Sequence, residues 1–318
     1  MAGELYDQLR QALRASEPVV LATIIVGPSP QLGMTMLVRP GSAHADPPGS
    51  AHADPPGSAH ADPPGSAHDD PPGSAHVRPG SAHADPPVVT GSLGDPELDR
   101  VVERDALGEL EVGRTGTRHY GPRGEARGTE LSVFIESFAP PPRMIIFGAV
   151  DFTAALGRVA KILGYHVTVC DPRPVFATAT RFPMADELVV DWPNRYLEKV
   201  GPDLGPRDAA CVLTHDAKLD VPAITAALAT RVGYLGVMGN RRTHTERMAR
   251  LREAGVDDAG LARLMAPIGL DIGSRTPEET ALSICAEIIA LRTGHDAPSL
   301  RDRGGPIHAR TEVVDSAP

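Results

Sequence analysis

Short apolar runs alternate with amphipathic segments over the second half of the chain. Five segments have the length and the β-branched composition of buried strands: MIIFG, HVTVCD, ELVVD, AACVLTH and GYLGVMG. Apolar residues at helical spacing follow in FTAALGRVAKILG, RYLEKV, VPAITAALATR and RTHTERMARLREAG. This alternation is typical of a parallel sheet covered by helices on both faces. We therefore predict an α/β protein with a Rossmann-like, doubly wound parallel-sheet domain at residues 143–294.

A final helix of this domain has clear signals at its start. In TPEE, Thr276 is placed to cap the helix, Pro277 takes the first helical position and Glu279 completes a capping box. A broad apolar stripe follows over residues 281–291, which predicts a buried helix face. We expect the tail at 295–318 to be flexible.

The first 138 residues follow a different pattern. An apolar stripe at helical spacing begins at Leu5 and predicts an initial helix. Strands are predicted for VVLATIIV, MTMLV, VVTGSL and ELSVFIESF, a helix for DPELDRVVERDAL, and a turn-rich segment for TGTRHYGPRG. We expect a small α+β domain at 1–138, ended by the linker APPPR, since successive prolines disfavour a helix and lack hydrogen-bond donors.

Residues 41–87 interrupt the first domain with a repeat. The tetrapeptide GSAH occurs six times there, mostly within GSAHADPP, and this composition cannot bury enough apolar surface to offset its ordering entropy. The block VRPGSAHADPP stands at 38–48 and again at 77–87, which indicates a tandem expansion inside a hairpin loop. Its histidines, at near-regular spacing, are His44, His52, His60, His68, His76 and His83. Their spacing is too long for a compact metal site, so we predict a disordered spacer.

Composition and charge narrow the classes of partner. The 318 residues are 41% hydrophobic and carry a formal charge of -10, which offers no basic field for nucleic acid or an anionic membrane. No apolar run approaches about 18 residues, and the first segment resembles an amphipathic helix rather than a signal peptide. Cys170, Cys211 and Cys285 lack the spacing of a zinc site or redox dithiol. We expect a cytoplasmic protein with buried thiols and no membrane or nucleic-acid partner.

Ligands of such a sheet bind at the carboxyl ends of its strands, which here run into FGAVDF, CDPRP, LTHD and MGNRR. In the first of these segments, Gly148 opens a tight turn, but Val150 and Thr153 replace the second and third glycines of the dinucleotide fingerprint. Asp151 is expected to cap the next helix, and it places negative charge where a phosphate would rest. These changes disfavour NAD in its usual position.

The other strand ends leave two interpretations open. Asp171 stands where an acidic residue could meet a ribose hydroxyl, or it could simply open a turn before proline. Arg241 and Arg242 begin a helix, where each cation costs about 0.3 to 1 kcal/mol, so they indicate either an anionic ligand or a solvated basic patch. His215 and Asp216 lie at the same predicted edge, with loop capping as their alternative role. No pattern indicates a nucleophile or a metal cage.

Taken together, several stretches resemble one family. MIIFGA, VTVCDPRPVFA, LTHD, YLGVMGNRR, ERMARLREAG and above all APIGLDIGSRTPEETALSICAEIIA are similar to the carboxyl-terminal half of the XdhC/CoxI proteins, the accessory factors of xanthine dehydrogenase and carbon monoxide dehydrogenase. VVLATIIVGPSPQLGMTMLV and ELSVFIES resemble their amino-terminal half. The resemblance implies a non-catalytic maturation factor that binds molybdenum cofactor, as molybdopterin or its cytidine dinucleotide form. It also implies a molybdenum hydroxylase client, a cysteine desulfurase partner and a homodimer.

The resemblance and the strand ends together give a set of expected cofactor-binding residues. They are Gly148, Ala149, Asp171, Arg173, His215, Asp216, Gly239, Asn240, Arg241, Arg242 and Asp271. Arg241 and Arg242 would offer counter-charge to the phosphate or pyrophosphate of the cofactor. We expect no catalytic residue and no metal ligand.

The sequence departs from the family pattern in three places. GAVDFT replaces the usual GAGHVG, GSLGDPEL at 91–98 lacks a GG core and its cysteine, and Arg127, Gly128 and Thr129 replace a later CGG. The lost cysteines argue against direct ligation of sulfur or molybdenum. Two alternatives therefore stay open beside the carrier: an NAD(P)-dependent oxidoreductase with the same fold, and a divergent scaffold with an empty pocket.

Overall fold

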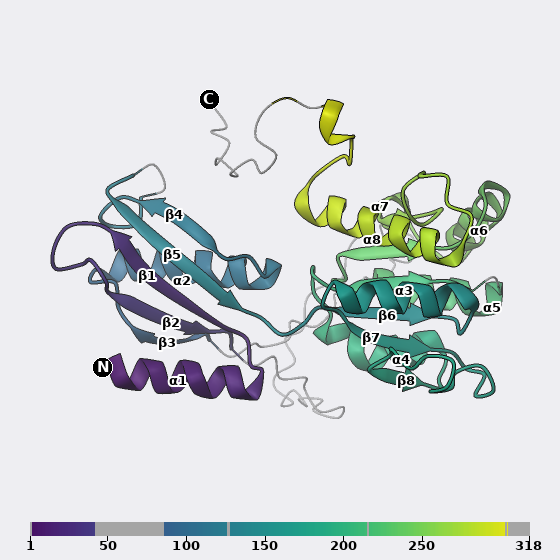
Figure 1. The fold of residues 1–318 in the computed structure, drawn as a ribbon, viewed down its shortest axis with the longest axis horizontal. Helices are drawn as coiled ribbons and strands as arrows, with labels where there is room; N and C mark the ends of the chain where they lie inside the picture. Colours follow the sequence, from purple (N-terminus) through teal and green to yellow (C-terminus); the bar gives the residue numbers. More distant parts are fainter. Residues whose placement is uncertain (1, 42–85, 126–127, 215, 303, 305–318) are drawn as a thin grey trace, which may run out of the picture. The chain divides into compact units, whose positions relative to one another are not determined.

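The computed structural model describes residues 2–41, 86–125, 128–214, 216–302 and 304, and they form two compact units (Figure 1). The amino-terminal unit comprises Met1–Leu110 and Thr115–Phe138, and the carboxyl-terminal unit comprises Glu111–Arg114 and Ala139–Pro318. Nearly all of the predicted repeat insert and most of the predicted tail lie outside the described residues. Among the residues that are described, no helix combines the length and apolar character needed to cross a membrane.

The amino-terminal unit is an antiparallel sheet with two helices. Its strands, in the order β3-β2-β1-β5-β4, are Val88–Gly91, Thr35–Arg39, Val19–Val26, Leu131–Phe138 and Gly116–Tyr120. Its helices are α1, Ala2–Ala15, and α2, Pro96–Val112. The apolar stripe of α1 packs on the sheet through Leu5, Leu9 and Ala12, which meet Val19 and Leu37. The predicted mixture of helices and strands is confirmed for this half of the chain.

Strand β4 corrects the prediction of a turn-rich segment at TGTRHYGPRG. Its residues pair in antiparallel register with β5, from Gly116 opposite Ile135 to Tyr120 opposite Leu131. Polar contacts to helix α2 fix the strand, because Arg118 donates to Glu109 and the Tyr120 hydroxyl donates to Asp105. Such contacts form only in the folded unit, so hydrophobic alternation along the sequence could not indicate this strand.

The carboxyl-terminal unit is a six-stranded parallel sheet with the order β11-β10-β9-β6-β7-β8. In chain order its strands are β6 Arg143–Phe147, β7 His166–Cys170, β8 Glu187–Val189, β9 Ala209–Val212, β10 Tyr234–Val237 and β11 Leu264–Met265. Its helices are α3 Asp151–Ile162, α4 Pro193–Val200, α5 Ala217–Leu228, α6 Arg241–Glu253, α7 Asp258–Ala262 and α8 Pro277–Thr293. The predicted doubly wound parallel sheet is confirmed.

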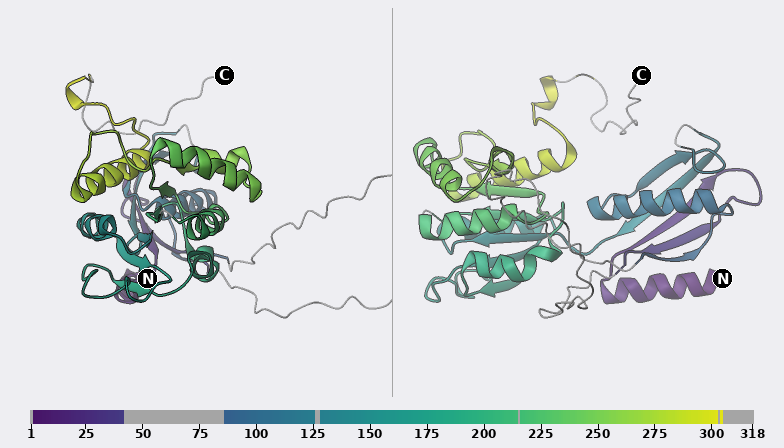
Figure 2. Two further views of the ribbon diagram at one scale, coloured as in Figure 1. Left: turned by 90° about the vertical axis from the view of Figure 1, so that its right-hand side faces the viewer. Right: turned by 180° about the vertical axis from the view of Figure 1, so that it is seen from behind.

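Alternate residues of the central strand β6 enter two separate apolar cores. Met144 and Ile146 pack with helices α3 and α8, and Ile145 and Phe147 pack with α4, α5 and α6. The two sets of helices lie on opposite faces of the sheet (Figure 2). Burial on both faces explains why these strands read as continuous apolar runs in the sequence.

Strand order also defines where a ligand could bind. The chain moves from β6 outward through β7 and β8, then returns to the other side of β6 and continues through β9, β10 and β11. The direction of winding therefore reverses between β6 and β9, which leaves a crevice at their carboxyl ends.

Helix α8 begins as predicted, since Thr276 and Glu279 form the capping box, and it ends at Gly294 in the left-handed conformation.

Candidate functional site

A pocket of about 680 Å³ lies at the carboxyl ends of the strands, among the segments that follow β6, β7, β9 and β10. Its lining residues are Val150, Arg173, Thr214, Asp216, Ala217, Leu219, Asp220, Val221, Thr243, Glu246, Arg247 and Arg250. They come from the loops after β6, β7 and β9 and from helices α5 and α6. This is the switch point at which an open α/β sheet binds its ligand.

The loop after β6 packs tightly against the loop after β9. Gly148 has a positive φ of 108°, and a Cβ atom there would lie 2.7 Å from Cγ2 of Thr214, so the position requires glycine. The N-cap of α3 is Val150, which corrects the prediction that Asp151 caps this helix. The Thr153 hydroxyl donates to the carbonyl of Gly148 and accepts from the Val150 N–H, which fixes the turn one residue earlier. Asp151 takes the first helical position, with its side chain 92% exposed.

Asp171 is fully buried between the loops after β6 and β7. Its Oδ2 accepts from the Ala149 N–H and from Arg173 Nη2, both at 2.8 Å. Its Oδ1 accepts from the Arg173 N–H and Nε, both at 2.9 Å. Burial alone would raise the pKa of Asp171, but these hydrogen bonds hold that pKa below its ordinary value. Both oxygens are thus engaged by the protein, which favours a role in shaping the turn over a role in binding ribose.

A buried ion pair joins the two helices that line the pocket. Arg247 Nη2 on α6 donates to Asp220 Oδ2 on α5 at 2.9 Å, with side chains only 6% and 4% exposed. Asp220 also accepts a hydrogen bond from the Thr214 hydroxyl. Arg247 Nη1 is buried and has no hydrogen-bond partner among the residues described. A buried charged donor without an acceptor costs more than the roughly 1 to 3 kcal/mol of a neutral one.

Neither Arg247 nor Asp220 is among the residues that the sequence predicted for the site. Arg247 lies one helical turn before the fully buried Leu251, so helical spacing alone places it on the inward face of α6. An arginine on an inward face requires a partner or a ligand, because a lone buried charge is strongly unfavourable. That position within the apolar stripe was the signal by which the sequence could have indicated Arg247.

Several expected site residues act as local caps. Asp216 caps α5 by accepting from the Lys218 N–H, and it also lines the pocket. Asn240 caps α6 by accepting from the Thr243 N–H at 2.9 Å. Gly239 precedes this cap, and a Cβ atom there would lie 2.7 Å from Thr243 Oγ1. Of the expected residues, the structure thus brings Asp216 and Arg173 into the lining of the pocket.

Other expected residues lie elsewhere. The Arg242 side chain is 89% exposed, approaches Glu246 at 3.5 Å and is not among the residues that line the pocket. Asp271 is exposed in the loop before α8 and does not line the pocket either. His215 and the side chain of Arg241 lie outside the described part of the chain. Contact between Arg241, Arg242 and an anion therefore stays a prediction.

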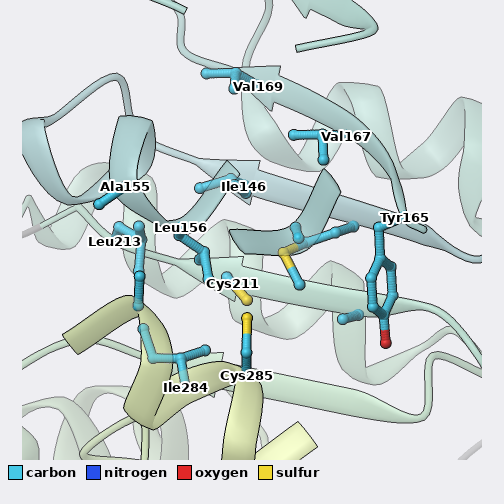
Figure 3. Close-up of a cluster of buried hydrophobic side chains, with 14 of the residues drawn as sticks. Ile146, Ala155, Leu156, Tyr165, Val167, Val169, Cys211, Leu213, Ile284 and Cys285 are labelled. Carbon is cyan, nitrogen blue, oxygen red and sulfur yellow. The ribbon is translucent and has the colours of Figure 1, made fainter. Parts of the chain in front are cut away.

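All three cysteines are buried, as expected. Burial raises the pKa of Cys170 to about 12 and that of Cys285 to about 11, and it raises the pKa of Cys211 well above its ordinary value. Cys211 of β9 faces Cys285 of α8 inside the apolar core (Figure 3). Burial therefore disfavours the thiolate form and keeps these thiols from serving as accessible ligands. The described ranges also contain no group of three or more His, Cys, Asp or Glu side chains suited to a metal ion.

The chain matches one family model and is similar to several curated proteins. Residues 144–288 match the model of the XdhC Rossmann domain. A protein of Bacillus subtilis named as a probable xanthine dehydrogenase subunit is 34% identical over 161 residues, which cover 51% of this chain and 46% of that protein. The molybdenum cofactor insertion chaperone PaoD of Escherichia coli is 26% identical over 178 residues, which cover 56% of this chain and 49% of that protein.

A solved structure from Bacillus halodurans, described as a xanthine dehydrogenase, aligns with 91% of this chain and 97% of its own, at 21% identity and a TM-score of 0.46. The matches to the two curated relatives span less than half of their length. The family match nevertheless covers the whole of the sheet that holds the pocket, apart from its first residue. The resemblance to the XdhC/CoxI family is thereby confirmed for residues 144–288, which match the XdhC Rossmann domain.

Proposed function

We propose that this chain is a non-catalytic carrier that binds molybdenum cofactor in the switch-point pocket and delivers it to a molybdenum hydroxylase. The observation that supports this most directly is the pocket itself, in the part of the chain that matches the XdhC Rossmann domain, with Arg173, Arg247 and Arg250 among its lining residues. One relative of this domain is named a molybdenum cofactor insertion chaperone, and another is named as part of a probable xanthine dehydrogenase.

The residues of the pocket suit the chemistry of this cofactor. Molybdopterin carries a phosphate and its cytidine dinucleotide form a pyrophosphate, and guanidinium groups bind both through paired N–H donors. The carboxylates of Asp216 and Glu246 also line the pocket, and they can accept from the N–H groups of a pterin ring. When bound, the cofactor supplies the redox chemistry of the client, and the side chains of this chain hold and release it.

Burial of the thiols supports carriage without covalent chemistry. Cys170, Cys211 and Cys285 are buried and their pKa values are raised, so none is accessible as a thiolate ligand for molybdenum. A cysteine desulfurase would then act on the bound cofactor directly. That partner and a homodimer stay predictions from the family resemblance, and a cytoplasmic location stays a prediction from the sequence.

An oxidoreductase that uses NAD(P) is the second candidate. The strand order of the sheet favours it, since this order is the one that binds dinucleotides. The loop after β6 argues against it, because Val150 lines the pocket where a glycine would let pyrophosphate approach the backbone. In addition, Asp171 already accepts hydrogen bonds on both oxygens, from the Ala149 N–H and from Arg173. Binding of ribose there would require these bonds to break.

Purification from a host that makes molybdopterin tests the proposal. Any pterin bound to the full chain is released by acid oxidation and measured by fluorescence, and NADH is titrated in parallel. Bound pterin without NADH binding is the expected result. NADH binding alone would overturn the carrier in favour of the oxidoreductase, and binding of neither would leave the scaffold with an empty pocket.

Two arginines of α6 provide a matched pair of variants. Arg250 lines the pocket and Arg252 does not, although both side chains are about half exposed and carry the same charge. We expect Arg250→Ala to lower pterin retention several-fold, because it removes a donor from the pocket wall. Arg252→Ala should retain as much pterin as the parent chain. Equal losses in both variants would mean that only the general charge of the helix matters.

A further inference from the structure

Arg173 presents a fixed guanidinium group to the switch-point pocket. Its Nε and Nη2 donate to the two oxygens of Asp171 at 2.9 and 2.8 Å. Its Cζ lies over the ring of Phe176, 4.6 Å from the ring centroid. Arg173 lines the pocket with its side chain 48% exposed, and its Nη1 has no hydrogen-bond partner among the residues described. The protein thus uses one edge and one face of the planar group and leaves Nη1 for a ligand.

Phe176 does not line the pocket, so it can act there only through Arg173. Its ring is 41% exposed, and its carbonyl oxygen accepts from Arg181 Nη1 at 3.1 Å. The same nitrogen donates to the carbonyl of Ala149 at 3.1 Å, which ties the loop after β7 to the loop after β6. An exposed arginine usually loses rotamer freedom when it binds a ligand, and here the contacts restrict that freedom in advance.

A carboxylate lines the same pocket at the start of α5. Asp216 Oδ1 accepts from the Lys218 N–H at 2.9 Å, which orients the side chain, and Oδ2 has no partner within the described part of the chain. The hydrogen bonds of Asp171 and, to a smaller degree, the charge of Asp216 raise the pKa of Arg173. Asp216 is thus near Arg173, but its Oδ2 remains available to a ligand. The pocket therefore offers a donor and an acceptor in one corner.

This donor and acceptor match one edge of a fused 2-amino-4-oxopyrimidine ring, the ring of a pterin. The edge carries a carbonyl oxygen, a ring N–H and an amino group. A guanidinium N–H can donate to the carbonyl oxygen, and a carboxylate can accept from the N–H groups beside it. Apolar side chains in the pocket lining can contact the flat faces of such a ring, and they are Val150, Ala217 and Leu219.

The charges of this corner suit an uncharged ring better than a phosphate. Asp171 already balances the charge of Arg173, with 2.8 Å between Oδ2 and Nη2. The carboxylate of Asp216 would also repel a phosphate. An uncharged edge that carries both a carbonyl oxygen and N–H groups avoids this repulsion.

We propose that Arg173 and Asp216 form a subsite for this edge of a pterin-type ring, and that Phe176 is a positioning residue that acts through Arg173. In the subsite, Arg173 Nη1 donates to the ring carbonyl, and Asp216 Oδ2 accepts from the ring N–H and the amino group. The subsite deepens the proposed function and rests on it for the identity of the natural ligand. It assigns the ring end of the cofactor to the loops after β7 and β9.

A matched pair of ring compounds tests the edge that is recognised. Dimethylpterin carries an amino group where dimethyllumazine carries a carbonyl oxygen, and the two are otherwise alike. Equilibrium dialysis against the full chain gives the affinity for each compound. We expect the parent chain to prefer dimethylpterin by at least about tenfold, because the extra carbonyl oxygen of dimethyllumazine would face the Asp216 carboxylate. Absence of binding to the parent chain, or equal affinity for the two compounds, would overturn the subsite.

Asp216→Asn changes the acceptor but keeps the cap of α5, since an asparagine oxygen can accept from the Lys218 N–H. The NH2 group then takes the place of Oδ2, so the preference for dimethylpterin should disappear. Circular dichroism confirms that the variant is folded. A preference equal to that of the parent chain in the folded variant would also overturn the subsite.

The role of Phe176 is tested by variants that keep or remove its ring. Phe176→Leu keeps an apolar side chain but removes the stacking on Arg173, and should weaken dimethylpterin binding about two- to fivefold. Phe176→Tyr keeps the ring and should bind as the parent chain does. Val175→Ala, at the neighbouring position, which is 73% exposed, should also bind as the parent chain does. Parental affinity in Phe176→Leu, or the same loss in either of the other variants, would refute the positioning role.

The outcomes separate the subsite from the carrier function. A preference for dimethylpterin that depends on Asp216, in a chain that retains no pterin on purification, would keep the subsite and refute the carrier. Pterin retained equally by the parent chain and Asp216→Asn, with no preference between the two compounds, would keep the carrier and refute the subsite.

Discussion

Replacement of Asp171 by asparagine tests whether this carboxylate stabilises the turn or serves to bind a ribose. In the structure, Oδ1 accepts from the N–H and Nε of Arg173, and Oδ2 accepts from the Ala149 N–H and Arg173 Nη2. An asparagine amide can present an oxygen to only one of these pairs, and its NH2 group would then face two donors. If Asp171 shapes the turn, Asp171→Asn should destabilise the protein without any ligand.

The size of the loss follows from the exposure of the two donors. The Ala149 N–H is buried, and leaving it unsatisfied costs about 1 to 3 kcal/mol. Arg173 is about half exposed, so solvent can replace its lost bond at a cost below about 1 kcal/mol. The sum is about 1 to 4 kcal/mol, which lowers the melting temperature of a unit of this size by roughly 2 to 16 °C.

The single tryptophan of the chain provides the assay. Trp192 lies in the carboxyl-terminal unit at the start of α4, so its fluorescence reports the unfolding of the sheet that holds Asp171. Urea or thermal unfolding of Asp171→Asn is compared with that of Asp151→Asn, whose side chain is exposed and whose loss should stay below about 1 kcal/mol.

The pH dependence carries a definite sign. The pKa of Asp171 is lowered in the folded protein. Its contribution to stability is therefore fully present when the pH is above the ordinary pKa of an aspartate, and it is lost as the pH falls through the lowered pKa. The difference between the parent chain and Asp171→Asn should therefore be complete at about pH 7 and shrink below about pH 4. Equal melting temperatures at neutral pH, with a defect seen only in nucleotide binding, would refute the structural role.

Two further predictions concern stability. Gly148→Ala should lower the free energy of unfolding by about 2 to 4 kcal/mol, because alanine is strained at a φ of 108° and its Cβ would press on Thr214 Cγ2. Thr214→Ser removes that methyl group, so the same loss for Gly148→Ala in the Thr214→Ser background would contradict the contact. Deletion of residues 49–87 should change the free energy of unfolding of the amino-terminal unit by no more than about 1 to 2 kcal/mol, because loop closure depends only weakly on length and Arg39 already pairs with Val88. A large loss of stability in circular dichroism melts of this deletion would show that the insert packs on the fold.

The sequence predicted the carboxyl-terminal fold well because each strand is buried on both faces. Alternation of apolar runs and amphipathic helices is a direct record of that burial, as the two cores on either side of β6 show. The start of α8 was equally predictable, since Thr276 and Glu279 bond to backbone groups within the same turn. Signals of this kind depend only on neighbours along the chain.

The sequence pattern did not predict the elements that depend on contacts with residues far away in the chain or that are very short. Strand β4 is a polar segment that Glu109 and Asp105 of another element hold in place. Strand β11 has only two residues and α7 only five, too few to show a period. The cap of α3 shifted from Asp151 to Val150 because Thr153 bonds back to the turn.

The sequence by itself determined which strand ends could hold a ligand, because the parallel direction of the strands follows from the alternating pattern. Only the tertiary structure decided which charges are available there. Asp171 is occupied by Arg173 and Ala149, and Arg247 pairs with Asp220, 27 residues earlier in the chain, because adjacent strands β9 and β10 bring α5 beside α6. Whether a charged group is paired or open depends on neighbours that only folding brings together, and the sequence does not display them.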